Sequence, residues 1–276
     1  MRFKIAVVQF EPDDSDVKKN LNKAERFIKR ASRKGADIII FPENFLSKPT
    51  KNKINTFIDS TSFSKKYFQN LAKKYSIDIV VGSIIEKTVF GNRYNTTYYI
   101  DSKGKIRCRY KKVNLWDTEK RSIVPGKKAK VFRTRFGDIG LIICWDLMFP
   151  EVFRKMEKKG ADIILCPSHW CYGDAKKGKK YDRDSEIKLV DSLCIDRAFE
   201  NEVILVYCNS AGKLKINNSW SVSIGHSQIT EPFRGAVKKL NHNREEMFIK
   251  EIDTSILKDA ESTYKIRKDL KRSRAR

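Results

Sequence analysis

A six-residue segment occurs twice in this chain, and each copy completes a strand–helix–strand pattern. The first copy is Gly35-Ala36-Asp37-Ile38-Ile39-Ile40 and the second is Gly160-Ala161-Asp162-Ile163-Ile164-Leu165. Each copy is a short apolar run after a glycine, which is typical of a buried strand. Because both copies stand in the same context, chance similarity is the weaker explanation. The sequence therefore predicts a duplicated α/β architecture.

A further predicted strand and helix precede each copy. Before the first copy these are Ile5 to Phe10 and the amphipathic stretch from Asp16 to Arg33. Before the second they are Ile139 to Cys144 and Pro150 to Lys159. Near-continuous apolar strands on both sides of a helix indicate parallel strands that are covered on both faces.

The remaining elements are predicted without any linker or low-complexity stretch between them. Strands are expected at Ile77 to Ile85, Tyr94 to Ile100, Lys105 to Tyr110, Val203 to Cys208, Ser219 to Ile229 and Met247 to Ile252, with a helix over Glu186 to Glu200. We therefore expect a single domain over residues 1–276.

Composition narrows the class of protein. The chain has 276 residues, of which 40% are hydrophobic, so it can bury a large core. No apolar run reaches the ~18 residues that cross a bilayer, and the first run is too short for a signal peptide. We therefore expect a cytoplasmic protein with no membrane partner. The six cysteines form no Cys-x-x-Cys pair, so we expect no disulfide framework.

The formal net charge is +24, which raises nucleic acid or an anionic surface as a partner. The densest basic segments run from Lys176 to Lys180 and from Lys265 to Arg276. The chain has no zinc-finger spacing and no aromatic signature of RNA recognition. A lysine-rich solvated surface is the favoured interpretation, and a nucleic-acid partner is not expected.

Glu43, Lys112 and Cys144 each stand at or just past the end of a predicted strand, where open α/β sheets form ligand crevices. A carboxylate can take the thiol proton, and an ammonium favours the thiolate and can hold an oxyanion. Taken singly, each residue has a simpler explanation. Glu43 and Lys112 could form a salt bridge, and Cys144 could pack in the core.

The surroundings of these three residues resemble the motifs of one family, the nitrilase (carbon–nitrogen hydrolase) superfamily, in its amidase- or carbamoyl-hydrolase-like branch. The matching segments are Phe41 to Phe45, Tyr110 to Trp116 and Ile142 to Glu151, with supporting matches at Arg197 to Asn201, Asn209 to Gly212 and Gly225 to Ile229. They follow the family order and cover nearly the whole chain.

The resemblance implies a four-layer αββα sandwich that is built from two similar halves, with a Glu-Lys-Cys triad. It implies hydrolysis of a small-molecule amide or N-carbamoyl substrate without metal or organic cofactor. It also implies a homodimer or a higher homo-oligomer. We expect the helix after Cys144, with Val152, Phe153 and Met156, to form the contact between subunits.

The resemblance also implies a role for each residue of the site. Cys144 attacks the carbonyl carbon and forms a thioester, while Glu43 acts as general base. Lys112 and the backbone N–H of Trp145 hold the oxyanion. Glu119 matches a second family glutamate, which orients the lysine and the attacking water.

The loop after Pro167 corresponds, in the second copy, to the loop that carries Glu43. It should therefore face the same crevice. We expect Ser168, His169 and Trp170 to contact the substrate, since loops carry binding residues disproportionately.

Two departures from the family pattern bear on the substrate and on the alternatives. Asn114 stands where many relatives have histidine. Asp146 stands where nitrile-hydrolysing members typically have glutamate, which favours an amide or carbamoyl substrate. Two other functions stay open: an acyltransferase of the same family, and a non-catalytic basic protein that binds nucleic acid or another anion.

Overall fold

The computed structural model describes residues 1–13, 16–46, 58–59, 62–216 and 219–273. Two sheets form its centre. The first has the strand order β15 (Glu246–Asp253), β1 (Arg2–Gln9), β2 (Ile38–Ile40), β4 (Asp78–Lys87), β5 (Arg93–Ile100) and β6 (Ile106–Lys111), with β3 (Ile58–Asp59) beside β4. The second has the order β14 (Gly235–Lys239), β13 (Gln228–Glu231), β10 (Ile204–Asn209), β9 (Ile163–Ser168), β8 (Gly137–Leu141) and β7 (Val131–Thr134). A separate two-stranded ribbon joins β11 (Lys213–Ile216) to β12 (Ser219–Val222).

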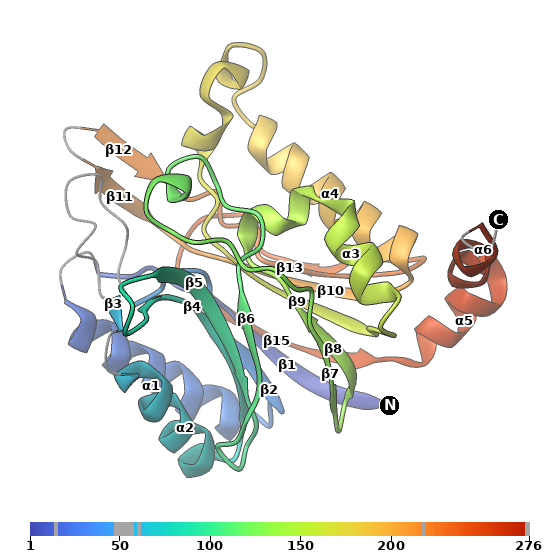
Figure 1. The fold of residues 1–276 in the computed structure, drawn as a ribbon, viewed down its shortest axis with the longest axis horizontal. Helices are drawn as coiled ribbons and strands as arrows, with labels where there is room; N and C mark the ends of the chain where they lie inside the picture. The colour runs from blue at the N-terminus through green and yellow to red at the C-terminus, as the bar shows by residue number, and fades with distance from the viewer. Residues whose placement is uncertain (14–15, 47–57, 60–61, 217–218, 274–276) are drawn as a thin grey trace.

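Helices cover the outer face of each sheet, as Figure 1 shows. The first sheet carries α1 (Val17–Arg33) and α2 (Phe63–Tyr75), and the second carries α3 (Pro150–Glu157) and α4 (Ser185–Asn201). One apolar cluster lies between the first sheet and its helices, and a larger one joins the two sheets and continues beneath α3 and α4. The predicted αββα sandwich is therefore confirmed.

The two sheets repeat one pairing scheme. In the first sheet β1–β2 and β2–β4 are parallel, and β4–β5 and β5–β6 are antiparallel. In the second sheet β8–β9 and β9–β10 are parallel, and β10–β13 and β13–β14 are antiparallel. The edge strands β15 and β7 pair antiparallel with β1 and β8. The sandwich thus consists of two similar halves.

The repeated sequence segment makes the same hydrogen bonds in both halves. The Asp37 N–H donates to the Lys4 carbonyl at 2.8 Å, and the Asp162 N–H donates to the Asp138 carbonyl at the same distance. In return, the aspartate side chains accept the N–H of Lys4 at 2.8 Å and of Asp138 at 3.0 Å. The glycine two residues earlier turns the chain out of the helix with φ near +72° or +78°. Each aspartate thereby fixes the start of its strand.

The amphipathic pattern of α1 explains its place. Leu21, Ala24, Ile28 and Ala31 are buried on one face, and the Asp16 side chain caps the helix by accepting the Lys19 N–H at 2.9 Å. In α3 the apolar residues Val152, Phe153 and Met156 are buried in the chain's own core. These three side chains therefore pack inside the chain, so a contact between subunits through α3 would use the other, exposed residues of this helix.

Several elements differ from expectation. The stretch Ser219 to Ile229 is two strands, β12 and β13, because Gly225 and His226 adopt positive φ and break the extended chain between them. The sequence prediction missed α2, β7, β14, α5 (Ser255–Tyr264) and α6 (Ile266–Ser273), and three 3₁₀ segments, η1 (Glu119–Arg121), η2 (Cys144–Met148) and η3 (Tyr172–Lys180).

All six cysteines are buried free thiols, as expected. In the part of the chain that the structure describes, no helix has the length and apolarity to span a membrane.

Candidate active site

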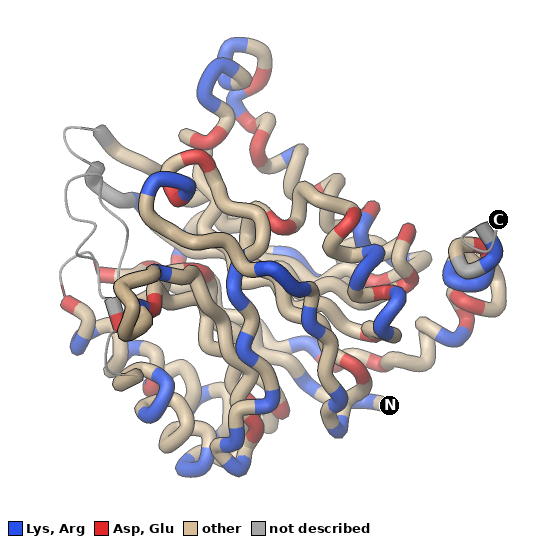
Figure 2. The backbone as a smooth tube through the Cα atoms, in the orientation of Figure 1, with Lys and Arg blue, Asp and Glu red and all other residues tan. Residues whose placement is uncertain are grey.

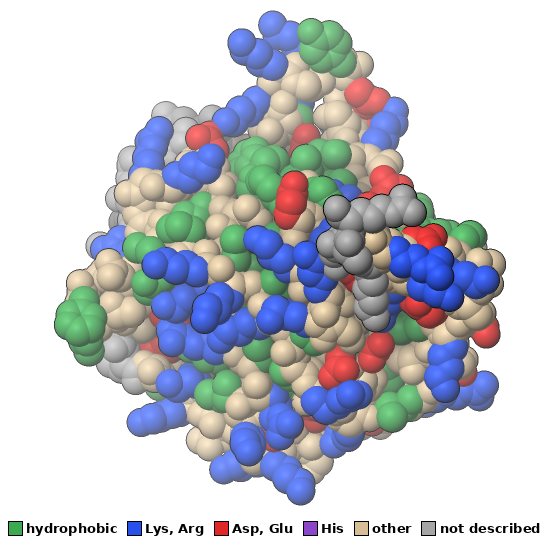
Figure 3. Space-filling model, turned by 45° about the vertical axis from the view of Figure 1, so that its right-hand side comes forward, with side chains coloured by type: hydrophobic (Ala, Val, Ile, Leu, Met, Phe, Trp, Pro, Cys, Tyr) green, Lys and Arg blue, Asp and Glu red, His purple; other side chains and the backbone are tan. Residues whose placement is uncertain are grey.

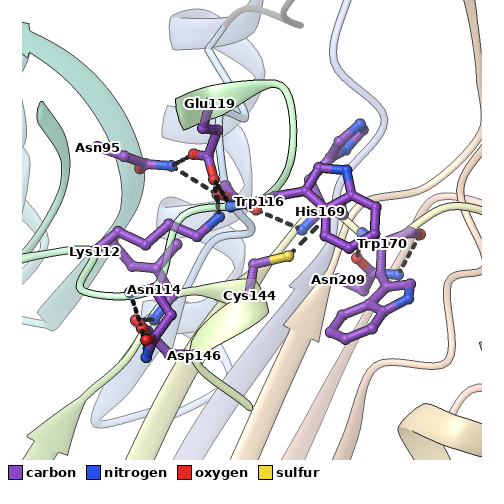
Figure 4. A network of polar contacts seen from close by, with 12 residues as sticks. Asn95, Lys112, Asn114, Trp116, Glu119, Cys144, Asp146, His169, Trp170 and Asn209 are labelled. Atoms are coloured by element: carbon purple, nitrogen blue, oxygen red, sulfur yellow. Dashed lines mark hydrogen bonds and ion pairs between the residues drawn. The ribbon is translucent and has the colours of Figure 1, made fainter. Parts of the chain in front are cut away.

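The three residues singled out in the sequence come together where β2, β6 and β8 end. Figure 4 shows two of them, Lys112 and Cys144, within the network of polar contacts. Glu43 follows β2, Lys112 directly follows β6, and Cys144 begins η2 shortly after β8. The Lys112 Nζ donates to Glu43 Oε1 at 2.8 Å, and Cys144 is close enough to influence the pKa of both. The ends of strands from both sheets therefore supply one cluster.

Lys112 is buried between two carboxylates. Its side chain is 1% exposed, and its Nζ donates to Glu119 Oε2 at 2.7 Å as well as to Glu43. Burial alone would lower the pKa of Lys112, but the charges of Glu119 and Glu43 raise this pKa well above its ordinary value. Lys112 is therefore a charged ammonium whose position is fixed by its hydrogen bonds to Glu43 and Glu119.

Asn95 on β5 is a member of the cluster that sequence reasoning missed. Its side-chain Nδ2 donates to Glu43 Oε1 and to Glu119 Oε1, each at 2.7 Å. Its backbone carbonyl accepts the backbone N–H of Lys112 at 2.8 Å. One side chain thus spaces the two carboxylates around the ammonium. The sequence signal was a run of polar residues, Asn95 to Thr97, just before the apolar end of the strand at Tyr98 to Ile100.

Glu43 is held as a carboxylate. Burial favours the protonated acid, but the Lys112 charge and hydrogen bonds from Lys112 and Cys144 hold the pKa of Glu43 below its usual value. Its second oxygen, Oε2, accepts the His169 N–H at 3.1 Å. The Glu43 N–H donates to the Ser168 carbonyl at 3.2 Å, which joins the corresponding loops of the two halves.

Cys144 stands at a strained turn. Its φ is +46°, in the left-handed region that non-glycine residues avoid. Asp146 stabilises the turn, because its Oδ2 accepts the Ile143 N–H and its own N–H donates to the Ile143 carbonyl, both at 3.0 Å. A sharp strand-to-helix turn of this kind projects the thiol from the end of the sheet.

The thiol of Cys144 is protonated in the resting protein. Burial and the neighbouring Glu43 charge raise the pKa of Cys144 well above its ordinary value, and Lys112 opposes them only in part. The ammonium of Lys112 favours the thiolate, as expected, but burial and the Glu43 charge outweigh its effect. The sulfur faces the His169 carbonyl at 3.9 Å. Attack by Cys144 requires a base at the moment of reaction.

The two departures from the family pattern, Asp146 and Asn114, contact each other. Asp146 accepts the Tyr110 hydroxyl at 2.8 Å, the Asn114 N–H at 2.8 Å and the Asn114 Nδ2 at 3.0 Å. Asn114 therefore supplies a side-chain hydrogen-bond donor at the position where many relatives have histidine. These bonds tie the loop that follows Lys112 to the turn that carries Cys144.

Glu119 lies on η1 and faces inward. Its Oε2 accepts the Trp116 N–H at 2.8 Å in addition to the Lys112 ammonium. Glu119 therefore fixes both Lys112 and the loop that runs from Lys112 to Glu119.

The three expected substrate-contact residues lie in different environments. Ser168 is fully buried. His169 bonds Glu43 through its backbone, and its Nδ1 lies 2.6 Å from Ser210 Oγ. Trp170 is 1% exposed, and its Nε1 donates to Glu186 Oε2 at 2.6 Å. Of the three, His169 has the side chain with partial exposure beside the cluster.

Tryptophans adjoin the cluster. The ring of Trp145 lies 4.2 Å from that of Trp116 and 5.5 Å from that of Trp170, measured between centroids. Lys176 on η3 lies over Trp116 at 5.5 Å and pairs with Asp117 at 2.5 Å, so η3 packs over the Trp116 loop. Within the described ranges, no three His, Cys, Asp or Glu side chains gather as a metal site would require.

Comparison with known proteins agrees with this geometry. The family model described as carbon-nitrogen hydrolase matches residues 4–261. A probable nitrilase of Schizosaccharomyces pombe is 31% identical, over 96% of this chain and 93% of that protein. The 2-oxoglutaramate amidase of Bacillus subtilis is 28% identical, over 84% of each chain.

A solved structure extends the likeness to the fold. The omega-amidase NIT3 of Saccharomyces cerevisiae is 27% identical in sequence, over 93% of this chain and 89% of that protein. The crystal structure of yeast Nit3, described as a member of branch 10 of the nitrilase superfamily, matches with a TM-score of 0.81 over 95% of this chain and 93% of that one. The chain therefore belongs to the carbon–nitrogen hydrolase family and is an enzyme that hydrolyses carbon–nitrogen bonds other than peptide bonds.

Proposed function

We propose that this chain hydrolyses a small linear amide through a thioester on Cys144, with Glu43 as base and Lys112 as oxyanion donor. The observation that supports this most strongly is the bonding of Lys112. Its ammonium is buried between Glu43 and Glu119, beside a protonated thiol. A salt bridge alone would not explain a buried thiol on a strained turn next to it.

The first half-reaction forms the thioester. Glu43, a carboxylate at neutral pH, takes the Cys144 proton as the sulfur attacks the carbonyl carbon. The developing oxyanion accepts hydrogen bonds from Lys112 and from the backbone N–H of Trp145 in the first turn of η2. Glu43 then gives its proton to the leaving ammonia or amine as the carbon–nitrogen bond breaks.

The second half-reaction releases the acid. Glu43 takes a proton from water, and the resulting hydroxide attacks the thioester carbonyl. Cys144 leaves and regains its proton from Glu43. Lys112 stabilises the second oxyanion as it did the first. Glu119 is a positioning residue in both steps, because it fixes the Lys112 ammonium and the Trp116 N–H.

The substrate that we favour is the primary amide at one end of a short chain. Two similar proteins are named for such activities, the yeast omega-amidase and the bacterial 2-oxoglutaramate amidase. Trp116, Trp145 and His169 provide partly exposed apolar and polar surface beside the cluster. An N-carbamoyl compound and transfer of the acyl group to an amine remain the alternatives within the same chemistry.

A panel of amides tests this function. We expect short ω-amides to be hydrolysed faster than N-carbamoyl amino acids, and mass spectrometry of quenched reactions to find the acyl adduct on Cys144. Cys144→Ala should lose both turnover and adduct. Lys112→Ala should lose ~10²–10³ in rate, because one oxyanion donor is removed, and Lys112→Arg should not restore it.

Cys166→Ala is the matched control, since Cys166 is a buried free thiol on β9. We expect this variant to keep its activity. Turnover by Cys144→Ala, or an adduct on Cys166 or Cys171, would rule out the assignment.

Three wider properties complete the proposal. The chain acts as one catalytic domain, works in the cytoplasm and forms a homodimer. Six buried free thiols support a reducing compartment. The charge distribution over the two helical layers supports pairing through α3 and α4, because this layer carries little net charge while that of α1 and α2 is strongly basic.

A further inference from the structure

A surface hollow of about 410 Å³ lies between β6 and the segment that leads into β7. Five basic residues line it: Arg107, Arg109, Lys128, Lys130 and Lys159. Its volume falls within the range of small-ligand sites. None of Glu43, Lys112 and Cys144 is among its lining residues, so the hollow is distinct from the candidate active site.

The strand pattern explains why basic side chains converge there. Along β6 the side chains alternate, so that Arg107 and Arg109 are exposed while Cys108 and Tyr110 are buried. Within the described chain, β6 pairs only with β5 and β7 only with β8, so each is the edge of its sheet. The Arg107 guanidinium spans the gap by donating to the Arg133 carbonyl at 3.3 Å.

Most of the charge around the hollow is not neutralised. Arg109 pairs with Glu86 at 2.5 Å, and Arg107 lies 4.0 Å from Asp101. Lys128, Lys130 and Lys159 are exposed, and no carboxylate of the described residues forms an ion pair with them. Converging like charges repel one another, and a multivalent anion would relieve that repulsion.

The wider surface agrees with this concentration of charge. Figure 2 shows Lys and Arg recurring along β6 and the segment before β7, and Figure 3 shows basic side chains gathered across one face of the molecule. The sequence alone favoured a scattered, solvated charge. In the structure, five of the basic side chains instead surround a hollow, and this arrangement is not expected of a surface that only interacts with water.

We propose that this hollow binds a small anion that carries two or more phosphoryl groups. Guanidinium and ammonium groups together are suited to phosphate oxygens, and several cations around a small volume favour a multiply charged ligand. A single carboxylate would leave most of them unpaired.

The lining favours a small phosphate compound over nucleic acid. Among the described residues that line the hollow, Phe132 is the one with an aromatic ring, and it packs on Tyr99 at 5.0 Å. A nucleic-acid groove uses exposed rings for base stacking and a charged track along the backbone. A bounded hollow with a half-buried ring offers neither.

Titration calorimetry of the full-length enzyme with inorganic pyrophosphate, at constant ionic strength, tests the proposal. We expect saturable binding by the wild type, and a loss of about tenfold or more in the double variant Lys128→Ala/Lys130→Ala, because hydrogen bonds to charged groups are removed. Lys159→Ala, a single exposed change, should also weaken binding.

The matched control is Lys18→Ala/Lys29→Ala, which removes two exposed lysines from α1. This variant loses the same net charge, so its pyrophosphate affinity should stay within about twofold of the wild type if the site is local. Amide hydrolysis should be retained in all three variants, which shows that they fold. The proposal is overturned if the wild type shows no saturable binding, or if both double variants lose affinity equally. It is likewise overturned if a short single-stranded RNA binds more tightly than pyrophosphate.

Discussion

At the scale of single residues, the candidate site depends on how Asn95 separates two carboxylates. It donates one hydrogen bond to Glu43 and one to Glu119, and both carboxylates also accept from Lys112. Without these donors, the two negative groups would compete for one ammonium. Asn95 is therefore a positioning residue of the proposed mechanism.

We expect Asn95→Ala to lower kcat by ~10–100-fold, the usual effect of losing a supporting partner of a site. It should also move the acidic limb of the kcat/KM profile to higher pH, because the pKa of Glu43 rises when a hydrogen bond to its charged form is lost. Asn201→Ala, which removes a buried asparagine from α4, is the control and should leave the profile in place. An unchanged profile in Asn95→Ala would refute this role.

The pH dependence of the wild type separates two modes of thiol activation. The pKa of Glu43 is lowered and that of Cys144 is raised, so the reactive pair at neutral pH is carboxylate and thiol. Reaction requires Glu43 to be ionised. We therefore expect kcat/KM to be flat through neutral pH and to fall only below the ordinary glutamate value of about 4.3.

A preformed thiolate predicts a different profile. Its rate would climb about tenfold per pH unit up to the thiol pKa, through and beyond the ordinary cysteine value of about 8.5. Rates measured from acid to alkaline pH, with circular dichroism at each point to verify folding, distinguish the two. A steady rise through pH 7–9 would contradict the general-base role of Glu43.

The sequence identified the site residues that lie in family motifs, and it missed Asn95, which lies outside them. Glu43, Lys112 and Cys144 stand at or just past the ends of predicted strands, and the resemblance of their surroundings to family motifs favoured a shared site over separate roles. Asn95 lies within a strand, and its two carboxylate partners are 52 and 24 residues away. The antiparallel pairings of β5 with β4 and with β6 bring it to the cluster, and pairing register cannot be derived from local pattern.

At the scale of elements, long apolar runs were predictable and short half-exposed ones were not. The repeated Gly-Ala-Asp segments match β2 and β9 because their strands are buried on both faces. By contrast, β7 and β14 are edge strands of four and five residues that are mostly half-exposed. Their sequences carry basic residues and little apolar periodicity, so tertiary pairing alone makes them strands.

Gly82 on β4 shows how an element positions a side chain that it does not carry. A Cβ there would lie 1.9 Å from the Pro42 carbonyl oxygen and 2.6 Å from that of Phe41. Both are backbone atoms just before Glu43, so they cannot turn aside. The close approach of β4 thus fixes the path of the chain into Glu43.

We expect Gly82→Ala to displace the Glu43 backbone and to lower kcat by ~10²-fold, since small misplacements of reacting groups have effects of this size. Gly173→Ala on η3 is the matched control, because its Cβ would meet no atom within 4 Å and its φ is not positive. Steady-state kinetics on the folded fraction of each variant make the comparison. A wild-type kcat in Gly82→Ala would show that the chain before Glu43 adjusts to the added methyl group, and would contradict this role of Gly82.

At the scale of the whole molecule, the two helical layers differ in charge. The layer of α1 and α2 contains eleven basic residues and one acidic residue. The layer of α3 and α4 contains four basic and six acidic residues. In a chain of net charge +24, the second layer is thus a surface that another copy can approach without strong repulsion.

A symmetric dimer brings the same patch of both copies together, so a uniformly basic layer would oppose itself. We therefore expect this chain to pair through α3 and α4 and to leave α1 and α2 exposed. Ile195 on α4 is a large apolar side chain that is 37% exposed, and Phe63 on α2 is 49% exposed. Ile195→Lys places a new charge in the expected contact, whereas Phe63→Lys places one on the free layer.

Sedimentation velocity at micromolar concentration should find the wild type and Phe63→Lys as dimers and Ile195→Lys shifted toward the monomer. Burying an unpaired ammonium in a contact is costly, so one substitution suffices to shift the equilibrium. A monomeric wild type would contradict pairing altogether. Dissociation by Phe63→Lys but not by Ile195→Lys would assign the contact to the basic layer, against the electrostatic argument.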